Sequence, residues 1–204
     1  MTEVIHIPYG DHPSQFGVLR VPKLSGRIPV IVTIHGGFWQ SKYGLEENDP
    51  LDEDLTRRGY ATWNIEYRRV GEDGGGWTGT FNDVIEAVNH LTQLEERFQL
   101  DLSQVIILGH SAGGHLALWL ASRINNVQTD EIGITLLVPI QSVISLAGVS
   151  DLRKMWDIHE ERGYVSHVAS LIGGSFCVEG QELVPITGMD KNIVRLPIRC
   201  ISKH

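Results

Sequence analysis

The sequence of 204 residues has little that would direct it to a membrane or out of the cell. Residues 1–6 carry no basic segment and no long apolar segment, so no signal peptide is predicted. No apolar run reaches the length of a membrane span. The two cysteines, Cys177 and Cys200, are too few for a disulfide framework. We therefore expect a cytoplasmic protein that makes no contact with a membrane.

Positive charge is also scarce. The 17 lysines and arginines are outnumbered by 25 aspartates and glutamates, which gives a net charge of −8 at pH 7. This charge argues against a nucleic-acid partner. The hydrophobic fraction of 42% is ordinary for a globular protein, and the length suits one domain with a buried core. The sequence leaves the oligomeric state open.

Two groups of residues that could hold a ligand match no binding signature. Residues 74–76 are three glycines, but they lack the Gly-Lys-Ser/Thr ending of a phosphate loop, so we interpret them as a connection. The spacing of His35, His110 and His115 matches no standard zinc signature. The sequence therefore predicts neither a metal nor an organic cofactor, and His115 is expected to pack against its neighbours.

Apolar runs and amphipathic patterns alternate along the chain. They predict strands at residues 4–7, 16–21, 29–34, 60–67, 105–108 and 143–146, and helices at 50–58, 80–98, 114–123 and 151–172. This alternation predicts an α/β fold, a doubly wound and mostly parallel sheet with helices on both faces. The first two strands are joined too closely for a crossover helix, so we expect them to pair antiparallel at one edge.

Polar residues mark the predicted helix starts. Asp49 is a predicted N-cap of the first helix, and Thr80 with Asp83 resembles a capping box. Asp83 is otherwise expected on a solvated helix face. Asp151 is expected to cap the helix that follows the sixth strand.

The clearest chemical signal is the segment Gly-His-Ser-Ala-Gly at residues 109–113, between a predicted strand and a predicted helix. A serine is a poor nucleophile unless its oxygen is held out of the sheet and a base can reach it. The flanking glycines remove the Cβ atoms that would clash in so sharp a turn. The following helix directs free N–H groups at the place where negative charge develops. Ser111 is therefore the candidate nucleophile.

A second motif, His-Gly-Gly-Phe-Trp at residues 35–39, directly follows the third predicted strand. It matches the type of loop whose backbone N–H groups form an oxyanion hole. The two motifs together, each after a strand and in this order, predict an acyl-transfer hydrolase that acts on a small-molecule acyl substrate.

The chain resembles the α/β-hydrolase superfamily, and within it the kynurenine formamidase and feruloyl/acetyl esterase-like branch. Residues 9–16, 35–39 and 109–115 carry this resemblance, which covers about residues 4–175. It implies hydrolysis of a small carboxylic ester or an aryl formamide through an acyl-enzyme. It also implies site roles for Ser111 as nucleophile, for His35 as support of the loop, and for the N–H groups of Ala112 and of Gly36, Gly37 or Phe38 as oxyanion donors.

The resemblance ends abruptly after Ser175. Family members carry the acid and the histidine of the triad in two later strand–helix units, on the order of 60 residues. Only 29 residues follow Ser175 here. We therefore divide the chain into an α/β-hydrolase core, residues 1–175, and a divergent tail, residues 176–204, with C-terminal strands and helices missing or altered. The sixth strand is then expected to be an open, aggregation-prone edge.

Several residues are candidates for the acid and base of the triad. The segment 183–194 resembles the one that normally carries the acid, which would make Asp190 the acid. His204 is the histidine that follows Asp190, but a terminal residue is poorly held for general-base work. His159 and His167 could replace the base. If no histidine reaches Ser111, the alternative is a non-enzymatic paralogue or isoform with a binding role or no stable function.

Overall fold

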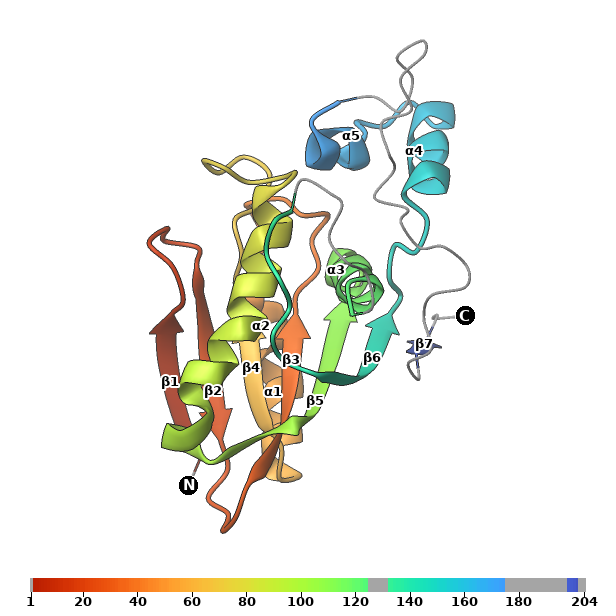
Figure 1. The fold of residues 1–204 in the computed structure, drawn as a ribbon. Coiled ribbons are helices and arrows are strands. Elements are labelled where there is room, and N and C mark those ends of the chain that lie inside the picture. The colour runs from red at the N-terminus through yellow and green to blue at the C-terminus, as the bar shows by residue number, and fades with distance from the viewer. Residues whose placement is uncertain (1, 125–131, 175–197, 202–204) are drawn as a thin grey trace.

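The computed structural model of the chain describes residues 2–124, 132–174 and 198–201. Within them one sheet has the strand order β1-β2-β4-β3-β5-β6-β7 (Figure 1). The strands are β1 (Glu3–Pro8), β2 (Phe16–Val21), β3 (Ile28–Ile34), β4 (Ala61–Ile65), β5 (Leu100–His110), β6 (Ile140–Leu146) and β7 (Ile198–Ile201). β2 pairs antiparallel with β1 and with β4, and all other neighbours are parallel. The predicted antiparallel edge pair and mostly parallel sheet are confirmed.

Helices cover both faces of this sheet. They are α1 (Asp49–Arg57), α2 (Gly79–Phe98), α3 (Ala112–Ser122), α4 (Leu152–Glu161) and α5 (His167–Ile172), with a 3-10 turn η1 (Leu45–Asn48) before α1. Figure 1 shows α2 and α3 in front of the sheet, α1 behind it, and α4 and α5 beyond the carboxyl ends of the central strands. Alternate residues of β3, such as Val30, Val32 and Ile34, are fully buried. This is the predicted doubly wound α/β architecture. No helix among the described residues is long and apolar enough to cross a membrane.

The structure corrects one helix start and confirms another. Asn48, not Asp49, precedes α1, because η1 runs directly into the helix and makes Asp49 its first residue. The Asp49 carboxylate instead lies 2.7 Å from a guanidinium nitrogen of Arg20. The predicted helix at 151–172 is divided into α4 and α5. Asp151 caps α4 as predicted, because its Oδ1 accepts a hydrogen bond from the Lys154 N–H at 2.9 Å.

The expectation of a capping box and a solvated Asp83 is wrong. The Thr80 hydroxyl donates to the Arg68 carbonyl at 2.5 Å and does not cap the helix. Asp83 is fully buried, and its Oδ1 lies 2.7 Å from Arg68 Nη2 and accepts from Gln15 Nε2 at 2.7 Å. A helical pattern cannot reveal this arrangement, because both partners come from distant parts of the chain.

The sixth strand is not an open edge. β7 pairs in parallel with β6, from Val143 opposite Ile198 to Leu146 opposite Ile201. The predicted open edge at the sixth strand is therefore wrong, because a short strand from the expected tail occupies the edge position.

The buried carboxyl group of Asp52 makes stability depend on pH. Asp52 on α1 is fully buried, accepts a hydrogen bond from the Thr33 hydroxyl at 2.9 Å, and lies 3.6 Å from Arg20 Nη1. Burial raises the pKa of Asp52 to about 7, although Thr33 and Arg20 act in the opposite direction. Between the ordinary pKa of 3.8 and about 7, the folded chain keeps a proton that the unfolded chain has lost. The free energy of unfolding therefore falls as pH rises through this window.

We expect a loss of about 4 kcal/mol from this group between pH 4 and pH 8, since one pKa unit corresponds to about 1.4 kcal/mol. Urea unfolding at several pH values measures it, with Asp52→Asn as the variant that lacks the titrating group. Equal pH slopes for the two proteins would contradict the prediction.

Candidate active site

Ser111 lies on a strained turn between β5 and α3, where the sequence places it. Its backbone has φ 52° and ψ −114°, a positive-φ conformation outside the left-handed helical region that costs free energy for a non-glycine residue. The Ser111 N–H donates to the Leu146 carbonyl at 2.9 Å, and the Ser111 carbonyl accepts from the Val149 N–H at 3.3 Å. The turn is therefore anchored on β6 and the segment after it. Ser111 is partly exposed, so its side chain can meet a ligand.

The loop at residues 35–39 lies directly beside this turn. Gly37, Phe38 and Trp39 all have positive φ, at 94°, 51° and 58°. A Cβ built on Gly36 would lie 3.1 Å from Ser111 Cβ, which shows how closely the two motifs approach each other. The structure therefore brings together the two segments that the sequence singled out.

Three predicted oxyanion donors are available. Within the described residues, the N–H groups of Gly37, Phe38 and Ala112 donate no hydrogen bond. The Gly36 N–H differs, because it points at Glu47 Oε1 at 3.4 Å. The candidate donors are therefore Gly37 or Phe38 together with Ala112, which is the first residue of α3.

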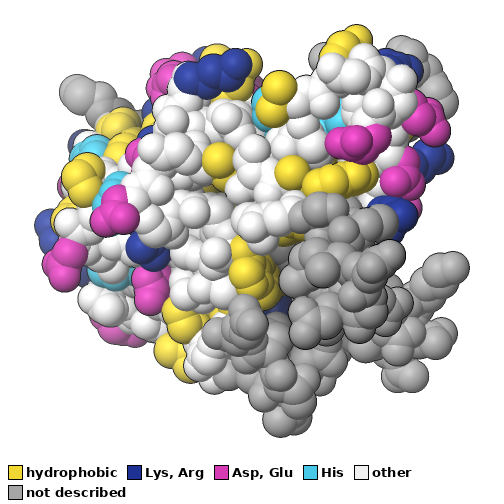
Figure 2. Space-filling view, turned by 90° about the horizontal axis from the view of Figure 1, so that it is seen from above, with side chains coloured by type: hydrophobic (Ala, Val, Ile, Leu, Met, Phe, Trp, Pro, Cys, Tyr) yellow, Lys and Arg dark blue, Asp and Glu magenta, His cyan; other side chains and the backbone are white. Residues whose placement is uncertain are grey.

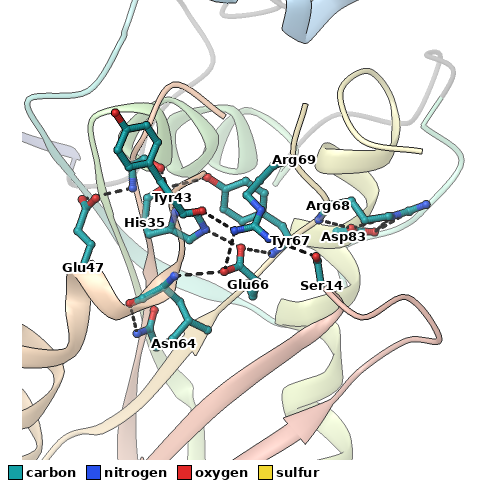
Figure 3. Close-up of polar contacts among 12 residues, drawn as sticks. Ser14, His35, Tyr43, Glu47, Asn64, Glu66, Tyr67, Arg68, Arg69 and Asp83 are labelled. Atoms are coloured by element: carbon teal, nitrogen blue, oxygen red, sulfur yellow. Dashed lines mark hydrogen bonds and ion pairs between the residues drawn. The ribbon is translucent and has the colours of Figure 1, made fainter. Parts of the chain in front are cut away.

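His35 supports the loop through a buried carboxylate. Its Nε2 lies 2.8 Å from Glu66 Oε1 and its Nδ1 lies 2.9 Å from the Gly36 carbonyl (Figure 3). The ring stacks on Tyr67 at 4.5 Å between centroids, and the Tyr67 hydroxyl donates to the His35 carbonyl at 3.1 Å. Glu66 also lies 3.2 Å from Arg69 Nη1. These contacts hold His35, and with it the start of the loop, in one orientation.

The support extends to the loop between β1 and β2. Arg69 Nε lies 3.0 Å from Glu72 Oε2, and the Ser14 hydroxyl donates to Glu72 Oε1 at 2.6 Å. Burial alone would raise the pKa of Glu72, but the hydrogen bonds from Arg69 and Ser14 outweigh it and lower the pKa to about 2. Glu72 is therefore ionised at neutral pH, and Arg69 links it to Glu66.

Sequence reasoning missed Glu47, Glu66, Tyr67 and Arg69. The position of residues 66–69 could have indicated their role. They directly follow β4, which pairs in parallel with β3, so they emerge at the same end of the sheet as the loop at residues 35–39.

The two histidines near Ser111 differ in surroundings. His110 is about half exposed, and its Nδ1 lies 2.5 Å from Glu47 Oε1. His115 is 3% exposed and makes edge contacts with Trp39 and Phe81. Burial lowers the pKa of His115 to about 3. It is therefore a neutral packing residue, as expected. No group of three or more potential metal ligands occurs in the described parts of the chain.

A pocket of about 600 Å³ adjoins the loop. Phe38 lines it together with residues of α4, α5 and the segment between them: Met155, Ile158, His159, Arg162, Tyr164, Val165 and His167. Figure 2 looks down on this side of the molecule, where several hydrophobic side chains are exposed. The pocket is mainly apolar and aromatic, and its Phe38 ring belongs to the same residue as a candidate oxyanion donor.

His159 and His167, the alternative bases, are placed in this pocket. Their rings lie 5.8 Å apart, at 6.1 and 4.8 Å from the Phe38 ring. Burial, the nearby His159 and Lys42 lower the pKa of His167. Within the described residues neither histidine hydrogen-bonds to Ser111. The remaining candidates, Asp190 and His204, lie outside the described residues.

The fold and the serine turn between β5 and α3 are those of an α/β-hydrolase. A model of the BD-FAE family matches residues 18–194, and the chain belongs to this family. This match and the relatives below confirm the predicted branch.

Among curated proteins, kynurenine formamidase of Drosophila melanogaster is 25% identical over 154 residues, which are 74% of this chain and 47% of that protein. Kynurenine formamidase of Salmo salar is 23% identical over 73% of this chain and 47% of its own length. The chain thus spans about half the length of these relatives. Among solved structures, esterase B from Lactobacillus rhamnosis has a TM-score of 0.74 at 25% identity, covering 86% of this chain and 57% of that chain.

Proposed function

We propose that this protein hydrolyses a small carboxylic ester or an aryl formamide through an acyl-enzyme on Ser111. The observation that carries the proposal is the strained serine turn at the end of β5, held against a loop with free backbone N–H groups. The names of the relatives, kynurenine formamidase and esterase, support the two substrate classes.

In the proposed reaction, Ser111 Oγ attacks the substrate carbonyl while a base takes the hydroxyl proton. The carbonyl oxygen becomes an oxyanion, and the N–H groups of Ala112 and of Gly37 or Phe38 donate to it. Each such donor lowers the barrier by about 3 kcal/mol. The alcohol or arylamine leaves with a proton, and water then releases the acid from Ser111. In this proposal Asp190 or another acid orients the base.

The pocket beside Phe38 is the proposed place for one side group of the substrate. Because Phe38 provides both a candidate N–H donor and one wall of the pocket, a carbonyl held at Ser111 directs part of the substrate toward it. The mainly apolar lining favours an apolar or aromatic group.

We also propose that turnover is low. In the described part of the chain no histidine hydrogen-bonds to Ser111, and a serine without its base retains only about 10³–10⁴ of acceleration over water. A second candidate function is that of a binding protein without turnover. It rests on the absence, within the described residues, of a histidine hydrogen-bonded to Ser111, and on the pocket beside Phe38.

The test compares the purified chain with Ser111→Ala on p-nitrophenyl acetate and on N-formylaniline. We expect slow hydrolysis by the wild-type chain. Rapid turnover that the substitution abolishes would support the serine mechanism and refute low turnover. Single alanine substitutions of His159, His167 and His204 would then identify the base.

A further inference from the structure

The oxyanion loop and the nucleophile turn extend from two neighbouring strands just beyond the point where these strands pair. The parallel register of β3 and β5 ends at Ile34 opposite Gly109. On its other side, the turn is fixed to β6 because the Ser111 N–H donates to the Leu146 carbonyl. On the β3 side, Gly113 of α3 packs closely against the Ile34 and His35 carbonyls, and a side chain makes a further contact between the two segments.

Glu47 supplies a contact at this place. It lies on η1, and one of its carboxylate oxygens, Oε1, is 2.5 Å from His110 Nδ1 and 3.4 Å from the Gly36 N–H nitrogen. Gly36 belongs to the oxyanion loop and His110 directly precedes the nucleophile. A single oxygen atom therefore joins the two motifs.

This junction lies close to the nucleophile. A Cβ built on Gly36 would be 3.2 Å from Glu47 Oε1 and 3.1 Å from Ser111 Cβ. Gly36 is buried, so its N–H needs a partner, and Glu47 is the one that the structure provides. Figure 3 shows Glu47 on the side of the loop away from Glu66, so two carboxylates hold the loop from different sides.

We propose that Glu47 is a positioning residue that sets the distance between the oxyanion donors and Ser111. The inference rests on the proposed function. The two hydrogen bonds differ in length, because the contact to His110 is short and the contact to Gly36, at 3.4 Å, is long and therefore weak. Glu47 touches no reacting atom, and it acts through Gly36 and His110. A displacement of about 1 Å in a reacting group can reduce a rate by about 100-fold.

The proposal holds that the oxygen of Glu47, and not its negative charge, positions the two segments. Two substitutions of Glu47 can distinguish these possibilities. The amide oxygen of Glu47→Gln can accept both hydrogen bonds without a negative charge. Glu47→Leu has similar size and accepts neither. The control is Glu53→Leu, which removes an exposed carboxylate from α1.

The experiment measures how fast a p-nitrophenyl alkylphosphonate labels Ser111, with the reversible affinity and the maximal labelling rate determined separately. For Glu47→Leu we expect a maximal rate about 10-fold to 100-fold lower at unchanged affinity. For Glu47→Gln we expect a rate within about threefold of wild type, and for Glu53→Leu no change. His110→Leu combined with Glu47→Leu should be no slower than Glu47→Leu alone, because the two residues act as one unit.

A maximal rate for Glu47→Leu that equals or exceeds that of wild type would overturn the proposal; a higher rate would mean that the carboxylate opposes the oxyanion. If the wild-type chain is not labelled at all, the proposed function fails instead. The contact is then tested in the Ser111→Ala background by the amide proton shift of Gly36. We expect Glu47→Leu to move this signal upfield and Glu47→Gln to retain it. An unmoved signal in Glu47→Leu would overturn the proposal independently of activity.

Discussion

A p-nitrophenyl alkylphosphonate is expected to leave one phosphonyl group on Ser111 of the wild-type chain and none on the Ser111→Ala variant. In this reaction the Ser111 Oγ–P bond forms, p-nitrophenolate leaves, and the hydroxyl proton passes to a base or to water. On the proposed mechanism, we expect the phosphonyl oxygen to lie where the oxyanion would form, beside the N–H groups of Gly37 or Phe38 and Ala112.

The labelling reaction suits this chain because it needs a single attack and no hydrolysis of the adduct. Intact mass and peptide mapping measure it, and Ser103→Ala is the matched control, since Ser103 is an exposed serine on the same strand. Ser103→Ala should be labelled like wild type, whereas Ser111→Ala should show a loss of labelling to background. Equal labelling of both variants would mean that Ser111 is not the nucleophile.

The sharp turn at Ser111 and the loop at residues 35–39 were predictable because the sequence encodes their conformations locally. Glycines at 109 and 113 and the run of apolar residues before them specify a sharp strand-to-helix turn. The structure gives Ser111 the strained, positive-φ backbone of such a turn. The alternation of strands and helices likewise determined the sheet, whose central strands are buried on both faces.

The polar support of the loop was not predictable, because it depends on residues that meet only in the folded chain. Glu66 and Glu47 follow no motif. Glu66, directly after β4, contacts His35, and Glu47, on η1, contacts Gly36. Asp83 has a helical position that looks solvated, and only the packing of α2 against Arg68 and Gln15 shows that it is buried. In each case the partner is distant in sequence, so no local pattern reports it.

The strand β7 was missed for a related reason. Its four residues, Ile198–Ile201, include an arginine and a cysteine and show no extended alternation. A strand this short is defined by its neighbour, and here β6 provides the partner.

The Gly113→Ala variant is expected to lose about 3 kcal/mol of stability, although alanine normally favours a helix over glycine by about 1 kcal/mol. Gly113 lies in the first turn of α3. A Cβ at this position would be 2.1 Å from the Ile34 carbonyl oxygen and 2.5 Å from the His35 carbonyl oxygen. Both are backbone atoms, one at the end of β3 and one at the start of the loop, so no movement of a flexible side chain can relieve the clash. Either α3 or the oxyanion loop must move.

Because Ser111 precedes α3 and the loop follows β3, either movement shifts Ser111 relative to the N–H groups of Gly37 and Phe38, and phosphonate labelling should slow by about 100-fold. Urea unfolding measures the first effect and the labelling rate the second. Gly133→Ala is the control, since a Cβ there meets nothing within 4 Å. A Gly113→Ala variant that gains stability, as helix propensity alone predicts, would show that the close approach of α3 to β3 does not constrain this site. If Gly113 packs against the end of β3 as the structure shows, the substitution must lower both stability and the labelling rate. A single close contact, between Gly113 and the Ile34 and His35 carbonyls, holds α3 and the loop together.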